Sequence, residues 1–153
     1  MSQVTSDGVS PSDRSLTIVV LLGGWSSERE VSLASGRAVI SALRSRGHDV
    51  RELDPAGIDI LTYPWAGVDA AFIALHGSFG EDGTVQSLLE DLRIPYTGSG
   101  PAASQLAMNK TASKQRFIAN GLPTPAFHTV HVQEPESSVA EKAAAFGYPL
   151  VVK

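Results

Sequence analysis

Cysteine is the most informative absence in this 153-residue chain, because it does not occur at all. Without cysteine, the chain can form neither disulfide bonds nor thiolate metal sites, and it has no cysteine nucleophile. The absence fits a reducing compartment, where disulfides do not persist. Any chemistry of this chain must therefore come from carboxylates, imidazoles, hydroxyls, amines and backbone groups.

Long apolar runs and strongly basic clusters are also missing. No apolar run approaches the roughly 20 residues that a membrane-spanning helix needs. Acidic residues outnumber basic ones by 16 to 12, and the net charge of −4 disfavours nucleic acid or an anionic membrane as the main partner. Met1–Ser15 is rich in serine, aspartate and glycine and has no apolar stretch, which predicts a disordered tail and not a signal peptide. Together these features predict a soluble, cytoplasmic protein.

The chain does contain an alternation of strand and helix patterns. Strands are predicted at Leu16–Leu22, His48–Leu53 and Val68–Leu75, with Asp54-Pro55 ending the second and a short edge strand at Ile94–Gly98. Helices are predicted from a cap at Ser27 to Gly47, at Thr84–Leu92 and at Pro101–Met108. This order is typical of an α/β fold with an open, mostly parallel sheet. Ligands bind such sheets at the carboxyl ends of the strands, so the glycine turns after the first and third strands should face one crevice.

A change of pattern near residue 100 predicts a domain boundary. An N-terminal α/β domain is expected over residues 16–100, and residues 101–153 are expected to begin a second domain. There, a helix is predicted at Asn109–Asn120, a strand at Phe127–Val132 and a helix at Ser137–Phe146. Gly147–Lys153 starts a further β-branched strand. We therefore expect this chain to be the front portion of a longer protein.

The first glycine turn, Gly23-Gly24, lacks the G-x-G-x-x-G spacing of dinucleotide-binding sites. It is followed by the carboxylates of Glu28 and Glu30, where a phosphate loop would present N–H groups and cations. Ser27-x-x-Glu30 matches a capping box, in which each side chain accepts from the other residue's backbone N–H, so Glu30 is assigned to the helix cap. Glu28 is either a favourable charge at the helix start or a ligand for a cationic group such as an ammonium.

A second glycine-rich turn follows the third strand and begins with His76. Three glycines within residues 77–83 indicate close backbone approach or left-handed geometry. His76 either bonds only within its own loop or donates to a carboxylate or phosphate in the crevice, where it could also act as an acid or base. Glu81 and Asp82 precede a helix and are interpreted as capping residues.

Two lysines are candidate anion ligands. Lys110 lies in the first turn of a predicted helix, where the helix dipole disfavours a cation, and this suggests an anionic partner. Lys153 ends an apolar strand and is either a surface lysine or a side chain that emerges into a site. A histidine metal site is not expected, because His128 and His131 are three apart in a predicted strand and face opposite sides.

Five motifs occur in order along the chain. They are Leu21–Ser32 (LLGGWSSEREVS), Ala74–Thr84 (ALHGSFGEDGT), Ile94–Gly100 (IPYTGSG), Met108–Lys110 (MNK) and Tyr148–Lys153 (YPLVVK). Together they resemble the D-alanine–D-alanine ligase family, and the resemblance covers residues 16–153. It implies the small α/β domain that precedes an ATP-grasp domain, followed by the truncated start of the ATP-grasp domain itself.

The resemblance also implies a reaction. The family activates the carboxylate of one D-alanine with the γ-phosphate of ATP, and the amine of a second D-alanine attacks the acyl phosphate, giving D-alanyl-D-alanine for peptidoglycan precursors. By motif, Lys110 and Lys153 would contact the phosphates of ATP. Mg²⁺ would neutralise the phosphates, with its ligands expected beyond Lys153. The full-length protein is expected to be a homodimer, and the isolated chain to be inactive.

Four further residues take roles from the same resemblance. Glu28 would hold the ammonium of the first D-alanine, with Val31 and Ser32 lining its pocket, and His76 would stand near the substrate carboxylate. Glu28 and His76 are thus the catalytic candidates. Trp25 departs from the pattern, since it is bulkier than the residue expected there. Two alternatives stay open: a D-alanine–D-lactate ligase, or a non-catalytic module that binds an amino acid.

Overall fold

The structure is a computed structural model that describes residues 14–152. The predicted tail lies outside the described residues except for its last two positions, and Lys153 also lies outside them. The chain divides into two compact units between Asn109 and Lys110, and each is described by itself. The boundary predicted at residue 100 lies one helix earlier, and the domain assignment stays a prediction.

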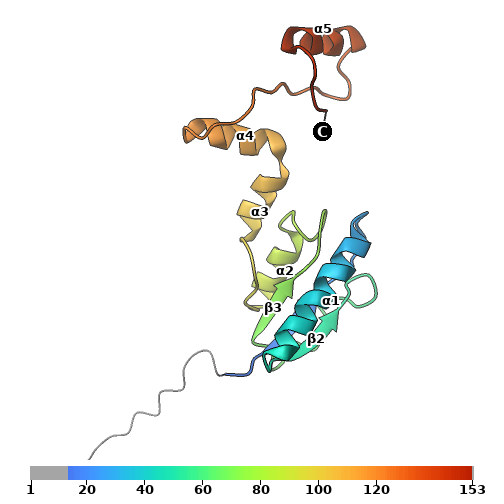
Figure 1. Ribbon diagram of the computed structural model, residues 1–153, viewed down its shortest axis with the longest axis vertical. Coiled ribbons are helices and arrows are strands. Elements are labelled where there is room, and N and C mark those ends of the chain that lie inside the picture. Colours follow the sequence, from blue (N-terminus) through green and yellow to red (C-terminus); the bar gives the residue numbers. More distant parts are fainter. Residues whose placement is uncertain (1–13, 153) are drawn as a thin grey trace, which may run out of the picture. The chain divides into compact units, whose positions relative to one another are not determined.

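The first unit is built on a three-stranded parallel sheet in the order β2-β1-β3 (Figure 1). The strands are β1 (Thr17–Leu21), β2 (Asp49–Leu53) and β3 (Ala70–Ile73). The predicted edge strand contributes one parallel bridge, between Ala71 and Tyr96. The predicted α/β fold with an open parallel sheet is therefore confirmed.

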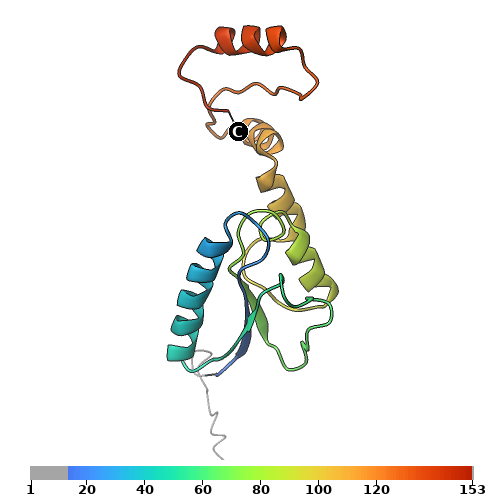
Figure 2. The ribbon, with the colours of Figure 1, turned by 90° about the vertical axis from the view of Figure 1, so that its right-hand side faces the viewer.

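Helices cover both faces of this sheet. The helices of the first unit are α1 (Arg29–Ser45), α2 (Thr84–Asp91) and α3 (Pro101–Met108). The view in Figure 2 shows α1 on one side of the sheet and α2 on the other. Side chains of β1 alternate between the two layers: Val19 joins a cluster with Val85 of α2, whereas Val20 joins a cluster with Ile40 of α1. Because β1 is buried on both faces, its sequence is an uninterrupted apolar run and does not alternate between apolar and polar residues.

Helix α1 packs against the end of β1 through Gly36. A Cβ atom added at Gly36 would lie 2.5 Å from Cβ of Leu22, which is shorter than any normal carbon–carbon contact. Glycine at this position therefore lets the helix approach the sheet closely enough to place its first turn beside the carboxyl end of β1.

The predicted capping box at the start of α1 is wrong. The helix begins at Arg29 with Glu28 at the N-cap, and no side chain caps it. The hydroxyl of Ser26, not that of Ser27, accepts the N–H of Glu28 at 3.1 Å. Because the helix starts one residue later than expected, Glu30 occupies the second helical position, where its charge still favours the helix N-terminus.

The second unit contains α4 (Lys110–Ala119) and α5 (Glu136–Phe146), both as predicted. Its connecting segment is held by Lys114, which donates to Oγ1 of Thr124 at 3.2 Å and to the carbonyl of Pro125 at 2.9 Å. The strand predicted at Phe127–Val132 is wrong, and residues 147–152 form no strand either. An alternating pattern indicates only which face of a strand would be apolar. A strand also needs a neighbour to pair with, and within the described range no strand pairs with these residues.

Among the described residues, 14–152, no helix has the length and apolarity needed to cross a membrane.

Candidate functional site

Two glycine turns lie at the carboxyl ends of the neighbouring strands β1 and β3. Gly23 and Gly24 have φ of +83° and +73°, and Gly77 in the second turn has φ of +69°, a region that side-chain-bearing residues rarely adopt. A Cβ atom added at Gly77 would lie 3.0 Å from Oε2 of Glu28. The carboxylate of Glu28 thus lies against the second turn, and the two turns face each other as their positions in the sheet predicted.

The hydroxyl of Ser32 connects the two turns by hydrogen bonds. Its side chain is fully buried. Its hydroxyl accepts from the N–H of Gly23 at 2.8 Å and donates to the carbonyl of Ala74 at 2.7 Å. Because both of these bonds are internal, Ser32 holds the two turns in place.

An ion pair between Arg29 and Asp54 supports the first turn and was not foreseen from the sequence. Nη2 of Arg29 lies 2.6 Å from Oδ2 of Asp54, and Nη1 donates both to Oδ1 at 3.1 Å and to the carbonyl of Gly24 at 2.8 Å. Oδ1 also accepts from the N–H groups of Gly24 and Ala56, each at 3.0 Å. The two charged side chains therefore connect the end of β2 to both backbone groups of Gly24.

These contacts also set the charge of Asp54. Its partial burial works to raise the pKa of the carboxyl, but the hydrogen bonds from Arg29, Gly24 and Ala56 outweigh burial and lower the pKa below its usual value. Asp54 is consequently a fixed anion at neutral pH. The sequence signal that could have found it is its position directly after β2, next to the first glycine turn across the parallel sheet.

His76 lies in the second turn between a hydroxyl and a carboxylate. Nε2 is 3.3 Å from Oγ of Ser35, and Nδ1 is 3.6 Å from Oε1 of Glu81. The hydroxyl of Ser35 also donates to the carbonyl of Val31 at 3.0 Å, which leaves its oxygen free to accept from Nε2–H. Glu81 is itself held by the N–H of Gly77, at 2.9 Å from Oε2. The imidazole ring of His76 therefore lies between Ser35 of α1 and Glu81 of its own turn.

The predicted capping role of the two acids before α2 is wrong, because Gly83 is the N-cap and no side chain caps this helix. Asp82 accepts from the N–H of Thr84, the first residue of α2, at 3.0 Å, and from the N–H of Phe79 at 2.8 Å. Burial works to raise the pKa of Asp82, but these hydrogen bonds lower it overall. Glu81 instead bonds within the turn, beside His76.

The remaining predicted residues fall into two groups. Val31 is on the first turn of α1 with 58% of its surface exposed, so it offers an apolar surface beside Glu28. Lys110 is exposed and is the first residue of α4 in the second unit. The structure therefore brings together Glu28, Val31 and the His76 turn, and it places Lys110 in a separate unit.

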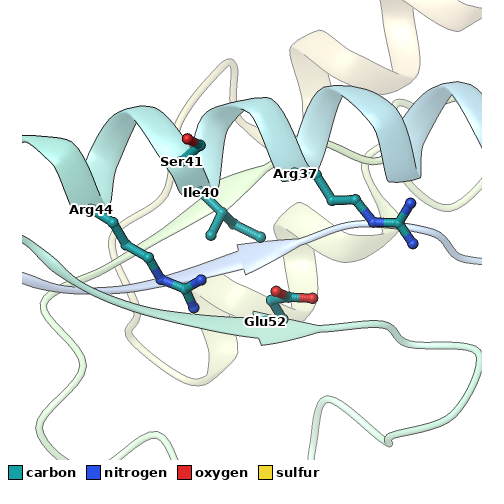
Figure 3. A pocket seen from close by; sticks show the side chains of 5 residues that line it. All are labelled: Arg37, Ile40, Ser41, Arg44 and Glu52. Atoms are coloured by element: carbon teal, nitrogen blue, oxygen red, sulfur yellow. The ribbon is translucent and has the colours of Figure 1, made fainter.

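Two grooves on the first unit lie elsewhere. One, of about 310 Å³, lies between α1 and the edge strand β2, where Arg37 and Arg44 extend from the helix on the same side as Glu52 (Figure 3). The other, of about 360 Å³, lies between the first turns of α2 and α3. Neither is lined by Glu28, Val31 or His76, so the candidate site is defined by the facing turns and not by either groove.

The part of the chain that the structure describes contains no group of three or more histidine, aspartate or glutamate side chains placed to hold a metal ion.

Comparison with known proteins gives one consistent result. Residues 61–99 match the family model described as the D-ala D-ala ligase N-terminus. The chain is 49% identical over its whole length to a D-alanine–D-alanine ligase of Cupriavidus taiwanensis, of which it covers 46%. It is 55% identical, over 89% of its length, to a D-alanine–D-alanine ligase of Geobacter sulfurreducens, of which it covers 42%.

Solved structures agree with the sequence relatives. The D-alanyl-alanine synthetase A of Vibrio cholerae matches 86% of this chain with a TM-score of 0.75 at 29% identity, and the match covers 45% of that protein. The D-alanine–D-alanine ligase of Bacillus anthracis complexed with ATP matches 84% of this chain with a TM-score of 0.70 at 32% identity, over 43% of its own length. The chain thus spans less than half the length of these relatives. By sequence and by fold it is similar to the N-terminal part of D-alanine–D-alanine ligases, and the resemblance inferred from its motifs is confirmed.

Proposed function

We propose that this chain forms the D-alanine-binding part, and the start of the nucleotide-binding part, of an ATP-dependent ligase that joins two D-alanines. The observation that carries the proposal is the position of the Glu28 carboxylate, which lies against Gly77 in the turn that also bears His76. An amino acid has an ammonium and a carboxylate on one carbon. An anionic group and an imidazole from two facing turns are complementary to that pair of charges.

Each residue of the crevice then has a defined part. From its place at the N-cap of α1, Glu28 would accept hydrogen bonds from the ammonium. His76, oriented by Ser35 and Glu81, would face the substrate carboxylate and offset its charge. Val31 would contact the methyl group, and Ser32 would act by holding both turns in place.

The nucleotide part of the proposal rests on the lysines. Lys110 is an exposed cation at the start of α4, where a phosphate would be attracted both by its charge and by the N–H groups of the helix. Lys153 keeps the same proposed role. ATP, when bound, supplies the phosphoryl group that activates the D-alanine carboxylate. We assign no Mg²⁺ ligand within residues 14–152, where the side chains present do not form a metal site. Homodimerisation and a cytoplasmic location complete the proposal.

The test is to titrate D-alanine into the 153-residue chain and to follow its amide resonances by NMR. In the wild type, the resonances of the two turns should shift. Glu28→Gln should weaken D-alanine binding by about tenfold or more, because a charged hydrogen bond is lost. Glu30→Gln is the matched control, since it removes a carboxylate two residues further along the same helix, and it should leave the dissociation constant unchanged.

D-lactate adds a second control, because it keeps the carboxylate and methyl of D-alanine but has a hydroxyl in place of the ammonium. It should bind the wild type more weakly than D-alanine, and Glu28→Gln should reduce that difference. Equal losses in the two glutamine variants, or D-alanine shifts that avoid both turns, would refute the assignment of Glu28.

A further inference from the structure

Trp25 is the residue of the first turn that the proposed chemistry does not use. It directly follows Gly23-Gly24, and 63% of its surface is exposed. Its ring meets Phe79 of the second turn edge to face, with the centroids 5.2 Å apart and the planes at 84°. Aromatic pairs favour this arrangement, because the positive edge of one ring meets the negative face of the other.

Phe79 is the fixed partner of this pair. Its backbone has φ of +73°, which is uncommon for a residue with a side chain, and its N–H donates to Oδ2 of Asp82 at 2.8 Å. Its ring packs against the core cluster that contains Leu75 and Val85. The position of Phe79 is therefore set by the core and by the turn before α2.

The first turn is held differently at its base and at its tip. At the base, the N–H of Gly23 donates to the hydroxyl of Ser32. The N–H of Gly24 donates to the carboxylate of Asp54. At the tip, the Trp25 ring reaches across to the second turn. The carboxylate of Glu28 follows three residues later and lies against Gly77, so the first turn contacts the second turn both at Trp25 and at Glu28.

We propose that Trp25 is a positioning residue whose contact with Phe79 sets the spacing between Glu28 and the His76 turn, and with it the affinity for the amino-acid ligand. The inference rests on the proposed function for the identity of that ligand, D-alanine. The contact itself is independent of the ligand. Trp25 does not need to touch D-alanine for this role.

If Trp25 sets the spacing between the two turns, substitutions at this position should have graded effects on D-alanine binding. Trp25→Ala removes the ring and should raise the D-alanine dissociation constant about two- to tenfold, the range expected for one aromatic pair. Trp25→Phe keeps an aromatic ring at the same position and should restore most of the affinity. Leu61→Ala is the matched control, since Leu61 is 57% exposed in the same unit and lies outside both turns. The thermal midpoint of Trp25→Ala should fall only by the few degrees that the loss of one aromatic pair costs, and those of Trp25→Phe and Leu61→Ala should stay close to the wild type.

The experiment has two arms on the 153-residue chain. In the ligand-free arm, amide hydrogen exchange is measured by NMR. Trp25→Ala should speed exchange at Glu28 and Arg29, whose N–H groups bond to Ser26 within the first turn, and Trp25→Phe and Leu61→Ala should not. In the second arm, the D-alanine dissociation constant is measured for the same variants.

The two arms separate failure of this inference from failure of the proposed function. If the wild type binds no D-alanine, the proposed function fails for this chain, and the exchange arm alone decides whether Trp25 positions the first turn. Exchange at Glu28 and Arg29 that is unchanged in Trp25→Ala would overturn the inference whether or not D-alanine binds. Faster exchange with an unchanged dissociation constant would overturn it as well.

Discussion

Replacing Asp54 by asparagine tests whether the ion pair with Arg29 supports the first glycine turn. Asparagine has nearly the same shape, and its carbonyl oxygen can still accept the N–H groups of Gly24 and Ala56. It loses the charge, and its NH₂ group cannot accept the Nη2–H of Arg29 that now reaches Oδ2 at 2.6 Å. The substitution therefore removes the charged part of the interaction and leaves most of the packing intact.

The expected magnitude follows from the exposure of the pair. Hydrogen bonds to charged groups contribute about 1.5–3 kcal/mol when they are sheltered, whereas exposed ion pairs contribute about 0.2–1 kcal/mol. The side chains of Arg29 and Asp54 are 39% and 29% exposed, which places the pair between these limits. After this allowance for solvent screening, we expect a loss of about 1–1.5 kcal/mol, or about 4–12 °C in the melting temperature of a unit of this size.

The pH dependence gives the sharper assay. The pKa of Asp54 is lowered in the folded state, so its contribution is fully present above the unfolded pKa of about 3.9 and is lost as the pH falls through the folded value. Melting curves followed by circular dichroism should therefore show the full gap between wild type and Asp54→Asn at pH 7 and pH 5. The gap should shrink progressively below pH 4.

Asp49→Asn provides the control in the same strand. Asp49 pairs with Arg51 at 3.6 Å, and the two side chains are 61% and 42% exposed, so its loss should cost no more than about 0.5 kcal/mol. The reasoning fails if Asp54→Asn and Asp49→Asn destabilise the chain equally at pH 7. It also fails if the Asp54→Asn gap stays constant down to pH 3, since the effect would then not come from the carboxylate charge.

Other substitutions test other contacts. Ser32→Ala leaves the buried N–H of Gly23 and the buried carbonyl of Ala74 without their partner, so the free energy of unfolding measured by chemical denaturation should fall by about 2–3 kcal/mol. A decrease below about 0.5 kcal/mol would contradict these two hydrogen bonds. Gly36→Ala should cost about 1–3 kcal/mol through the clash with β1, while Gly57→Ala, whose nearest atom is 4.0 Å away, should change stability by less than about 0.5 kcal/mol. The pKa of Glu134 is lowered to about 2 mainly by its hydrogen bond from Lys142, so NMR titration of Lys142→Ala should show it rising toward about 4.3.

The elements that the sequence predicted well are those whose signal is local. The run at Leu16–Leu22 became β1 because uninterrupted β-branched residues suit a strand buried on both faces. The helix at Pro101–Met108 has the predicted bounds, since proline is favoured at the first helical position. The position of His76 at the end of a strand followed from the same local pattern.

The contacts that the sequence did not reveal join residues far apart in the chain. In the sequence, Asp54 is recognisable only as part of the Asp54-Pro55 pair that ends a strand. Its partner Arg29 is distant in the chain and is brought near by the parallel pairing of β1 and β2. The strand predicted at Phe127–Val132 failed for a related reason. An alternating pattern states which face of a strand would be apolar, but a neighbouring strand must supply the hydrogen bonds.

Ser32 shows how a motif residue can be identified correctly and its role still left open by the sequence. The motif places it beside Glu28, and the resemblance assigns it to the ligand pocket. In the structure, its hydroxyl accepts from Gly23 after β1 and donates to Ala74 after β3. Which way a helical side chain points depends on where the helix starts, and α1 starts one residue later than the capping pattern predicted.

A single buried hydroxyl therefore connects the two turns that carry the proposed ligand contacts. Glu28 and His76 come from different strands, so their separation depends on how β1 and β3 end and not on either turn alone. Ser32 fixes this separation at the base, the Arg29–Asp54 pair fixes the orientation of the first turn, and the Trp25–Phe79 contact spans the tips. A substitution at any of these three places should change the binding of an amino acid without removing a group that touches it.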